Sequence, residues 1–247
     1  MKQPLIFAHR GVKSTHPENT MIAFLEAERI GTHGIELDIH LSKDGEIIVI
    51  HDETLDRTTN GSGLVHQHTL QELKRLDAGR YFNPAFQGEA IPALREVLQW
   101  LQTNKLLVNI ELKNDIIPYP GLEEKAVALV RELGLENRTI FSSFHHDSIA
   151  LLAALAPDID RAILYHHPIA DPLQEAAIRK AKGLHPNFQL LTKDFVQEAQ
   201  AKGYAIRPYT INEYEDLRTM IDCGVDVIIT DYPARAFELL AKQGELR

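Results

Sequence analysis

The sequence of 247 residues is 44% hydrophobic and 25% charged, a composition typical of a globular chain with enough apolar material for a large core. Its formal net charge of -9 provides no basic footprint, so we expect no nucleic acid partner, although a local cluster of cations can still hold a phosphate group. The single Cys223 excludes an internal disulfide framework, and no apolar run approaches the roughly 20 residues that span a membrane, so we expect a cytoplasmic protein without stable membrane insertion.

Short apolar segments alternate with amphipathic segments along almost the whole chain. The predicted strands are 5–8, 34–41, 106–112, 139–144, 161–165, 183–186, 204–209 and 227–230. The predicted helices are 20–30, 121–133, 147–156, 171–182, 193–202, 212–222 and 233–242. This order predicts an α/β fold, a parallel TIM (β/α)8 barrel, within one domain over residues 1–247. A doubly wound open sheet is the alternative, but no GxGxxG motif follows the first strand to support its dinucleotide-binding form.

Helix starts are predicted from capping residues. Asn19 or Thr20 is expected to cap the first helix. Asp147 and Asn212 are expected to cap two later helices, Asn212 together with Glu215 in a capping box.

The segment 34–41 has a clear strand pattern. Its alternation places Glu36, Asp38 and His40 on one face and apolar residues on the other. A solvated hairpin with charged outward positions would show the same pattern. Residues 47–50 of the returning strand are apolar on both faces, however, so we expect a covered hairpin whose carboxylates need a cation or protons.

A turn follows this strand at Asp44-Gly45. If Ser42 pairs near Glu46, the antiparallel register places His51 beside Leu37, to within about two residues. The hairpin is therefore expected to bring a histidine to the two carboxylates.

The interval 53–92 interrupts the alternation of strands and helices. It contains the sequence TTNGSG at 58–63 and a short helix that Thr69 and Glu72 would start with a capping box. We interpret it as an insertion over one end of the barrel; an ordinary surface excursion is an equal alternative. Its aromatic residues favour a substrate-facing flap only mildly: Tyr81, Phe82 and Phe86.

In such a barrel, function lies at the C-terminal ends of the strands. The polar residues at these positions in the first half, with the glycine that follows Arg10, are His9, Arg10, Gly11, Glu36, Asp38, His51, Asp52, Glu111 and Lys113. Those in the second half are Ser142, Ser143, His145, His185, Arg207, Thr210, Asn212 and Asp231. Because histidines, carboxylates and cations are densest in the first half, we expect the site there.

Three carboxylates of this set suit a metal ion. Glu36, Asp38 and Glu111 offer hard oxygen ligands, which favour Mg²⁺ or Ca²⁺ over Zn²⁺. The alternative is a structural network in which Arg10 and Lys113 balance the same charges.

Two histidines and two cations complete the set. Histidine side chains ordinarily titrate near neutrality, so His9 and His51 could form a general acid–base pair, whereas the alternative is packed or surface histidines. Arg10 and Lys113 could hold a phosphate, the arginine with a planar fork and the lysine as a point charge.

In this order and combination, the chain resembles the glycerophosphodiester phosphodiesterases. The motifs that carry the resemblance cover almost the whole chain: His9-Arg10-Gly11, Pro17-Glu18-Asn19-Thr20, Glu36-Leu37-Asp38, Asp44-Gly45, His51-Asp52, Glu111-Leu112-Lys113, Tyr209-Thr210-Ile211-Asn212, Gly224-Val225-Asp226 and Thr230-Asp231-Tyr232-Pro233.

The resemblance implies a metal-dependent TIM-barrel hydrolase that cleaves small-molecule glycerophosphodiesters to sn-glycerol 3-phosphate and an alcohol, and we expect a cyclic phosphate intermediate. The implied roles are metal binding by Glu36, Asp38 and Glu111, acid–base catalysis by His9 and His51, and phosphate contact by Arg10 and Lys113. Glu18 and Asn19 match a loop motif that braces the site, and Tyr209 replaces a tryptophan that many members carry near the glycerol pocket.

Two other functions remain open. A phospholipase C or D type enzyme would act on lipid head groups, and a non-catalytic barrel would bind a phosphorylated metabolite without turnover.

Overall fold

The computed structural model describes residues 3–245, with side chains described up to 242, and its strands form one sheet. The parallel strands are β1 (Leu5–His9), β2 (Gly34–Leu41), β4 (Leu107–Leu112), β5 (Thr139–Ser143), β6 (Asp160–Tyr165), β7 (Gly183–Pro186), β8 (Ala205–Ile206) and β9 (Val227–Thr230). Their spatial order is β8-β7-β6-β5-β4-β2-β1-β9, and β3 (Ile47–Val49) pairs antiparallel with β2. The predicted parallel barrel is confirmed.

The barrel closes between β8 and β9, the two ends of this order. Asp226 N–H donates to the carbonyl of Ile206 at 2.9 Å, and Ile229 N–H donates to that of Pro208 at 3.2 Å. The predicted strand 204–209 is therefore too long, since regular pairing covers only β8. Pro208 has no N–H to donate, which interrupts the ladder.

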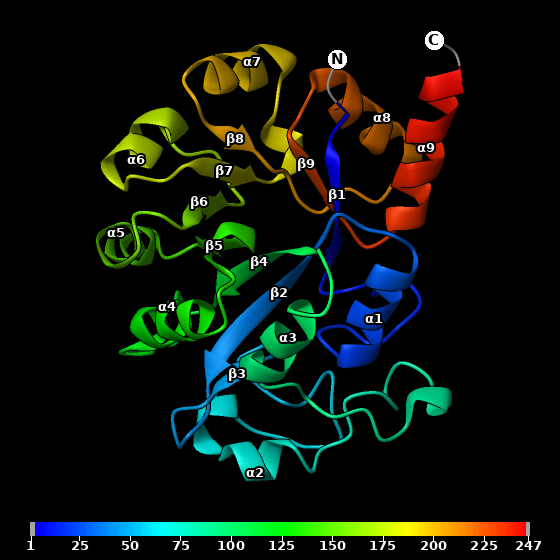
Figure 1. Cartoon of the computed structure of the whole chain (residues 1–247), viewed down its shortest axis with the longest axis vertical. Helices are drawn as coiled ribbons and strands as arrows, with labels where there is room; N and C mark the ends of the chain where they lie inside the picture. The colour runs from blue at the N-terminus through cyan, green and yellow to red at the C-terminus, as the bar shows by residue number, and fades with distance from the viewer. Residues whose placement is uncertain (1–2, 246–247) are drawn as a thin grey trace.

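Helices cover the outside of the barrel (Figure 1). Their bounds, together with those of the short helix after β3, are α1 (Met21–Arg29), α2 (Leu70–Leu73), α3 (Leu94–Leu101), α4 (Leu122–Glu132), α5 (His146–Leu155), α6 (Pro172–Ile178), α7 (Lys193–Ala201), α8 (Tyr214–Cys223) and α9 (Pro233–Glu245). Of the two candidates for the first cap, Thr20 is the N-cap, because its hydroxyl accepts from Ala23 N–H.

Two predicted caps are wrong. Asp147 lies inside the first turn of α5, and its carboxylate pairs with Arg179. Asn212 precedes the N-cap of α8, and its amide donates to Asp231 at 2.9 Å, so it forms no capping box with Glu215. In both cases a partner distant in sequence uses the polar side chain.

Side chains that point into the barrel change character along the strands. Phe7, Ile140 and Val227 form an apolar cluster near the N-terminal ends. Further along, Asn109 donates to Ser142 at 3.0 Å inside the barrel. The apolar layer thus closes one end of the barrel and leaves the other end for polar groups.

The hairpin has the predicted register. Ile39 lies opposite Val49, and Ile50 N–H donates to the carbonyl of Asp38 at 3.1 Å. Continuing this register places His51 opposite Leu37, as expected. Every residue of β2 is buried, so the hairpin is covered.

The segment 53–92 follows the hairpin and lies at the lower end of Figure 1. It shares a separate apolar cluster with β3, in which Leu55, Leu73 and Ile91 pack against Ile48. The Thr69–Glu72 capping box is present at the start of α2.

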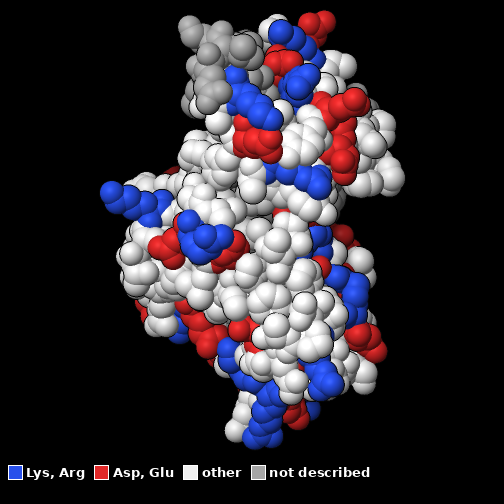
Figure 2. All heavy atoms as spheres, turned by 90° about the vertical axis from the view of Figure 1, so that its right-hand side faces the viewer, with Lys and Arg blue, Asp and Glu red and all other residues white. Residues whose placement is uncertain are grey.

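One face of the molecule, drawn in Figure 2, carries mixed charge. On the face drawn in Figure 2, Lys and Arg side chains are interspersed with Asp and Glu, so this face has no basic stripe of the kind that binds nucleic acid. Within residues 3–245, no helix combines the length and apolar character needed to cross a membrane.

Candidate active site

Three acidic side chains meet at the C-terminal end of the barrel. Glu36 and Asp38 come from β2, and Glu111 comes from the adjacent strand β4. One carboxylate oxygen from each residue lies within 4.8 Å of those of the other two. Glu36 and Asp38 are 3% and 0% exposed, so water cannot screen their repulsion effectively.

The neighbouring cations do not complete this cluster. Arg10 Nε lies 3.3 Å from Asp38, and Lys113 Nζ donates to Glu111 at 2.9 Å. Among the described residues, however, Glu36 Oε1 and Asp38 Oδ1 are buried without a hydrogen-bond partner. Unpaired carboxylate oxygens beside a third carboxylate fit a divalent cation that prefers oxygen ligands, whereas a purely structural ion-pair network would leave fewer of them unpaired.

The ionisation of the carboxylates reflects this crowding. Burial, with the charges of Asp38 and Glu111, raises the pKa of Glu36 well above its usual range. Burial also raises the pKa of Glu111, to about 7. Asp38 is buried as well, but Arg10 and Lys113 keep its pKa below its usual range. The cluster therefore resists carrying three negative charges without a cation.

His9 lies at the end of β1, beside this cluster. Its Nδ1–H donates to Asp231 at 2.6 Å, and its Nε2 lies 3.9 Å from Glu36. Asp231 is held in turn by Asn212, and Lys13 lies 3.4 Å away. Burial and the charge of Arg10 lower the pKa of His9 to about 4.

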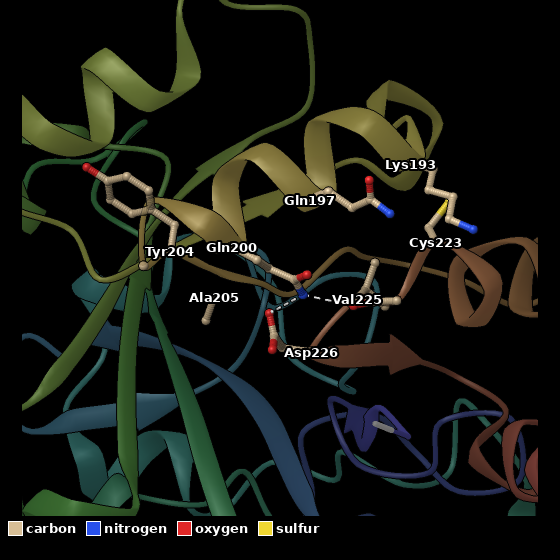
Figure 3. A pocket seen from close by; sticks show the side chains of 10 residues that line it. Lys193, Gln197, Gln200, Tyr204, Ala205, Cys223, Val225 and Asp226 are labelled. Carbon is tan, nitrogen blue, oxygen red and sulfur yellow. Dashed lines mark hydrogen bonds between the residues drawn. The ribbon is translucent and has the colours of Figure 1, made fainter. Parts of the chain in front are cut away.

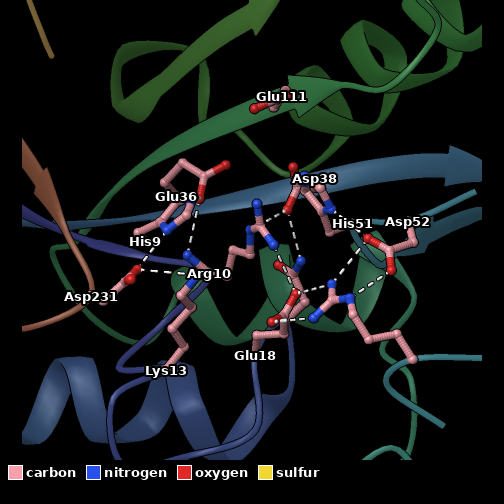
Figure 4. A network of polar contacts seen from close by, with 12 residues as sticks. His9, Arg10, Lys13, Glu18, Glu36, Asp38, His51, Asp52, Glu111 and Asp231 are labelled. Carbon is pink, nitrogen blue, oxygen red and sulfur yellow. Dashed lines mark hydrogen bonds and ion pairs between the residues drawn. The ribbon is translucent and has the colours of Figure 1, made fainter. Parts of the chain in front are cut away.

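His51 forms a similar pair after β3. Its Nδ1–H donates to Asp52 at 2.7 Å, and its Nε2 accepts from Lys113 at 3.3 Å. Burial lowers the pKa of His51, so the neutral ring is favoured. Figure 4 shows the two histidine–aspartate pairs on opposite sides of Glu36 and Asp38.

His40, which shares the strand face of Asp38, supports His51 through the backbone. Its Nε2–H donates to the carbonyl of His51 at 3.0 Å, and its Nδ1 accepts from the Tyr119 hydroxyl at 2.9 Å. It is fully buried, and so it holds the loop rather than facing a ligand.

The turn after β1 places Arg10 over the carboxylates. Arg10 has a φ of +56°, and its N–H donates to Glu36 Oε2 at 2.9 Å. Gly11 follows with a φ of +78°, and a Cβ there would lie 2.6 Å from that of Ala23, so glycine is required. Asn19, also with positive φ, donates to Asp38 at 2.8 Å. Asn19 therefore braces the site, and the cap belongs to Thr20.

Tyr209 lies in the stretch after β8, against two other rings. Its ring centroid is 6.1 Å from that of Phe144 and 6.4 Å from that of His166. Its hydroxyl is buried without a hydrogen-bond partner among the described residues, and burial raises the pKa of Tyr209.

Most polar residues of the second half have structural partners. His185 is buried beside Arg207, and Ser143 donates to the carbonyl of Leu112 at 2.9 Å. His145 shares a hydrogen bond with Ser148 at 2.9 Å. Asp231 is the member of this group that supports a site histidine.

A cavity of about 520 Å³ lies away from this site, where β8 and β9 begin (Figure 3). Gln200 donates to Asp226 at 3.0 Å and to the carbonyl of Gly224 at 2.8 Å. Asp226 also accepts from Ile206 N–H. These hydrogen bonds join α7 to the barrel, so few of the polar atoms involved remain to bind a ligand.

Sequence patterns did not assign several supporting residues. Asp52 and Asp231 lie at predicted strand ends, but the sequence pattern alone does not show that they orient histidines. For Asp52, its position next to His51 is the one feature that could have indicated this. Arg57, which bonds both Glu18 and Asp52, lies in the insertion, where no periodicity points to it.

Comparisons with known proteins agree with this geometry. A sequence model of the Glycerophosphoryl diester phosphodiesterase family matches residues 9–235. The chain is 43% identical over 240 residues to a glycerophosphodiester phosphodiesterase of Caldanaerobacter subterraneus subsp. tengcongensis, covering 97% of this chain and 99% of that protein. It is 46% identical over 237 residues to a glycerophosphodiester phosphodiesterase of Bacillus altitudinis, covering 95% and 97%.

A solved structure also matches. The phosphodiesterase of Oleispira antarctica, in complex with the product sn-glycerol-3-phosphate, aligns with a TM-score of 0.87 at 31% identity and covers 97% of both chains. The chain therefore belongs to the glycerophosphoryl diester phosphodiesterase family and is an enzyme of that family.

Proposed function

We propose that this enzyme hydrolyses glycerophosphodiesters to sn-glycerol 3-phosphate and an alcohol, with one divalent cation, Mg²⁺ or Ca²⁺. Glu36, Asp38 and Glu111 would hold the cation, and His9 and His51 would transfer protons. The observation that carries this proposal is a buried carboxylate cluster with unpaired oxygens, flanked by two histidine–aspartate pairs.

The charge at the cluster supports a bound cation. With all groups ionised, the three carboxylates exceed the charges of Arg10 and Lys113 by one negative charge, which would repel a phosphodiester anion. A divalent cation changes this excess to one positive charge, which a singly charged phosphodiester neutralises. When bound, the cation would act as a Lewis acid on a phosphoryl oxygen.

Arg10 and Lys113 would contact the phosphoryl oxygens and stabilise the charge that develops on them. Both are already fixed by carboxylates, so little reorganisation is needed when substrate binds. The aromatic face and free hydroxyl of Tyr209 would contact the glycerol side of the substrate.

Both histidines exchange protons through Nε2, because each Nδ1–H is committed to an aspartate. One histidine removes the proton of the glycerol hydroxyl next to the esterified carbon, and that oxygen attacks phosphorus. The bond from phosphorus to the alcohol breaks, and the other histidine protonates the departing oxygen. Water then opens the five-membered cyclic phosphate while the two histidines exchange roles.

A substrate panel tests this proposal. With Mg²⁺ or Ca²⁺ supplied, glycerophosphocholine and glycerophosphoethanolamine should release glycerol 3-phosphate, and intact phosphatidylcholine should not be cleaved. Release of a head group from the intact lipid would instead indicate a phospholipase, and tight binding without turnover would indicate a binding protein.

A substrate analogue tests the cyclic intermediate. The phosphocholine ester of propane-1,3-diol lacks the neighbouring hydroxyl, so it should bind and resist cleavage. Its hydrolysis at the rate of glycerophosphocholine would contradict attack by the substrate's own hydroxyl.

A further inference from the structure

Arg57, in the insertion after the hairpin, connects two acidic residues that border the site. Its guanidinium donates to both oxygens of Glu18 at 2.8 and 2.9 Å. It also donates to both oxygens of Asp52 at 2.6 and 3.0 Å. Such paired contacts fix the position of both carboxylates relative to the guanidinium plane.

Each of these carboxylates holds a residue of the proposed reaction centre. Asp52 accepts from His51 Nδ1–H at 2.7 Å, and Glu18 accepts from Arg10 Nη1 at 2.9 Å. Figure 4 shows Glu18 and Asp52 beside Arg10 and His51. Arg57 thus contacts His51 through Asp52 and Arg10 through Glu18. Through Arg57, the insertion is linked to both.

The two histidine–aspartate pairs differ in what supports them. Asp231 is held by Asn212, which precedes α8 of the barrel. Asp52 has a side chain that is 24% exposed, and apart from His51 its side-chain partner is Arg57. Without Arg57, Asp52 could turn to water and no longer orient the imidazole of His51.

The loop around Glu18 depends on the insertion as well. Glu18 N–H donates to the Tyr81 hydroxyl at 3.2 Å, and the rings of His16 and Phe86 lie 5.1 Å apart. Arg10 keeps a second partner in Asp38 at 3.3 Å, so loss of Arg57 should disturb His51 more than Arg10.

We propose that Arg57 is a positioning residue, which orients His51 through Asp52 and steadies Arg10 through Glu18. This inference rests on the proposed function, because it assigns His51 to proton transfer. Replacement of groups that stand behind ligands and catalytic residues typically costs 10–100-fold in activity. We therefore expect Arg57→Ala to lower kcat by about 10–100-fold and to change KM less.

Arg57→Ala should also respond to added guanidinium ion, since the Arg57 side chain is 46% exposed and its removal opens a water-accessible gap. Millimolar guanidinium should restore part of kcat in Arg57→Ala, but not in Arg57→Ala/Asp52→Asn, which lacks one carboxylate of the site. Arg57→Lys should recover only part of the activity, because an ammonium group cannot make paired hydrogen bonds to both carboxylates as the planar guanidinium does.

Arg95→Ala is the matched control. Arg95 forms a two-bond ion pair with Glu132 on the surface, with contacts of 2.5 and 2.8 Å. This variant should keep wild-type kcat and gain nothing from guanidinium.

Wild-type activity in Arg57→Ala would overturn the inference. So would a loss of kcat that neither guanidinium nor Arg57→Lys reverses, because that result describes a folding defect. The NMR signal of the His51 Nδ1–H proton gives a readout that does not depend on turnover, and the Asp52→Asn variant assigns it. The signal should be shifted downfield in wild type and lost in Arg57→Ala. If wild type cleaves no glycerophosphodiester, the proposed function fails, and this resonance still decides whether Arg57 orients His51.

Discussion

Neutralising Glu36 should remove most of the response of the enzyme's stability to divalent cations. One carboxylate oxygen each of Glu36, Asp38 and Glu111 lies within 4.8 Å of the other two. At an effective dielectric constant of about 20, two unit charges at that distance repel by about 3.5 kcal/mol. Arg10 and Lys113 offset part of this repulsion, and a bound cation would remove more of it.

The expected size of the response follows from binding linkage. A cation at one hundred times its Kd, bound only to the folded chain, stabilises it by about 2.7 kcal/mol. Each kcal/mol raises the Tm of a chain of this size by roughly 2–4 °C. Wild type should therefore melt roughly 5–11 °C higher in saturating Mg²⁺ or Ca²⁺ than in chelator.

Glu36→Gln tests this reasoning in a thermal-unfolding assay. The amide oxygen can still accept from Arg10 N–H, but two of the three repulsive carboxylate pairs are lost. The variant should melt no lower than wild type in chelator and lose most of the metal-induced shift. Glu132→Gln, on the surface, should behave like wild type. A wild-type shift in Glu36→Gln, or no shift in wild type with either metal, would refute the reasoning.

Substitutions at four other positions separate catalysis from stability. Alanine at His9 or His51 should lower kcat by about 10²–10⁴ with an unchanged circular dichroism spectrum, and near-wild-type turnover in both would remove the acid–base assignment. Asp231→Asn should lower kcat by about 10–100-fold through His9 and leave the Tm shift with metal in place; loss of that shift would assign Asp231 to cation binding instead. Thr20→Ala should lower the free energy of unfolding, measured in urea, by about 1 kcal/mol because the N-cap of α1 is lost, whereas Thr20→Ser should keep it. An equal loss in both variants would show that the Thr20 hydroxyl does not stabilise the helix.

Local periodicity predicted the parts of the fold that depend on alternation. The segment 34–41 is β2 to the residue, and the turn at Asp44-Gly45 set the register that brings His51 to the carboxylates. Glu111 and Lys113 share a face because they are two residues apart, and their side chains form an ion pair. Strand alternation and hairpin geometry are local rules, so the sequence is sufficient for them.

Long-range polar contacts could not be predicted in the same way. Asn212 has a residue type that often caps helices, but its amide donates to Asp231, 19 positions away. Arg57 lies in a segment without periodicity, and its two carboxylate partners are 39 and 5 positions away. Such contacts depend on which loops meet at the barrel end, which no window of sequence specifies.

Cation dependence of turnover tests the proposed active site most directly. The measurement is release of sn-glycerol 3-phosphate from glycerophosphocholine by metal-stripped enzyme, before and after Mg²⁺ or Ca²⁺ is restored. We expect the stripped enzyme to be inactive and at least one of the two cations to restore turnover. Full turnover in the presence of chelator would contradict a cation held by Glu36, Asp38 and Glu111.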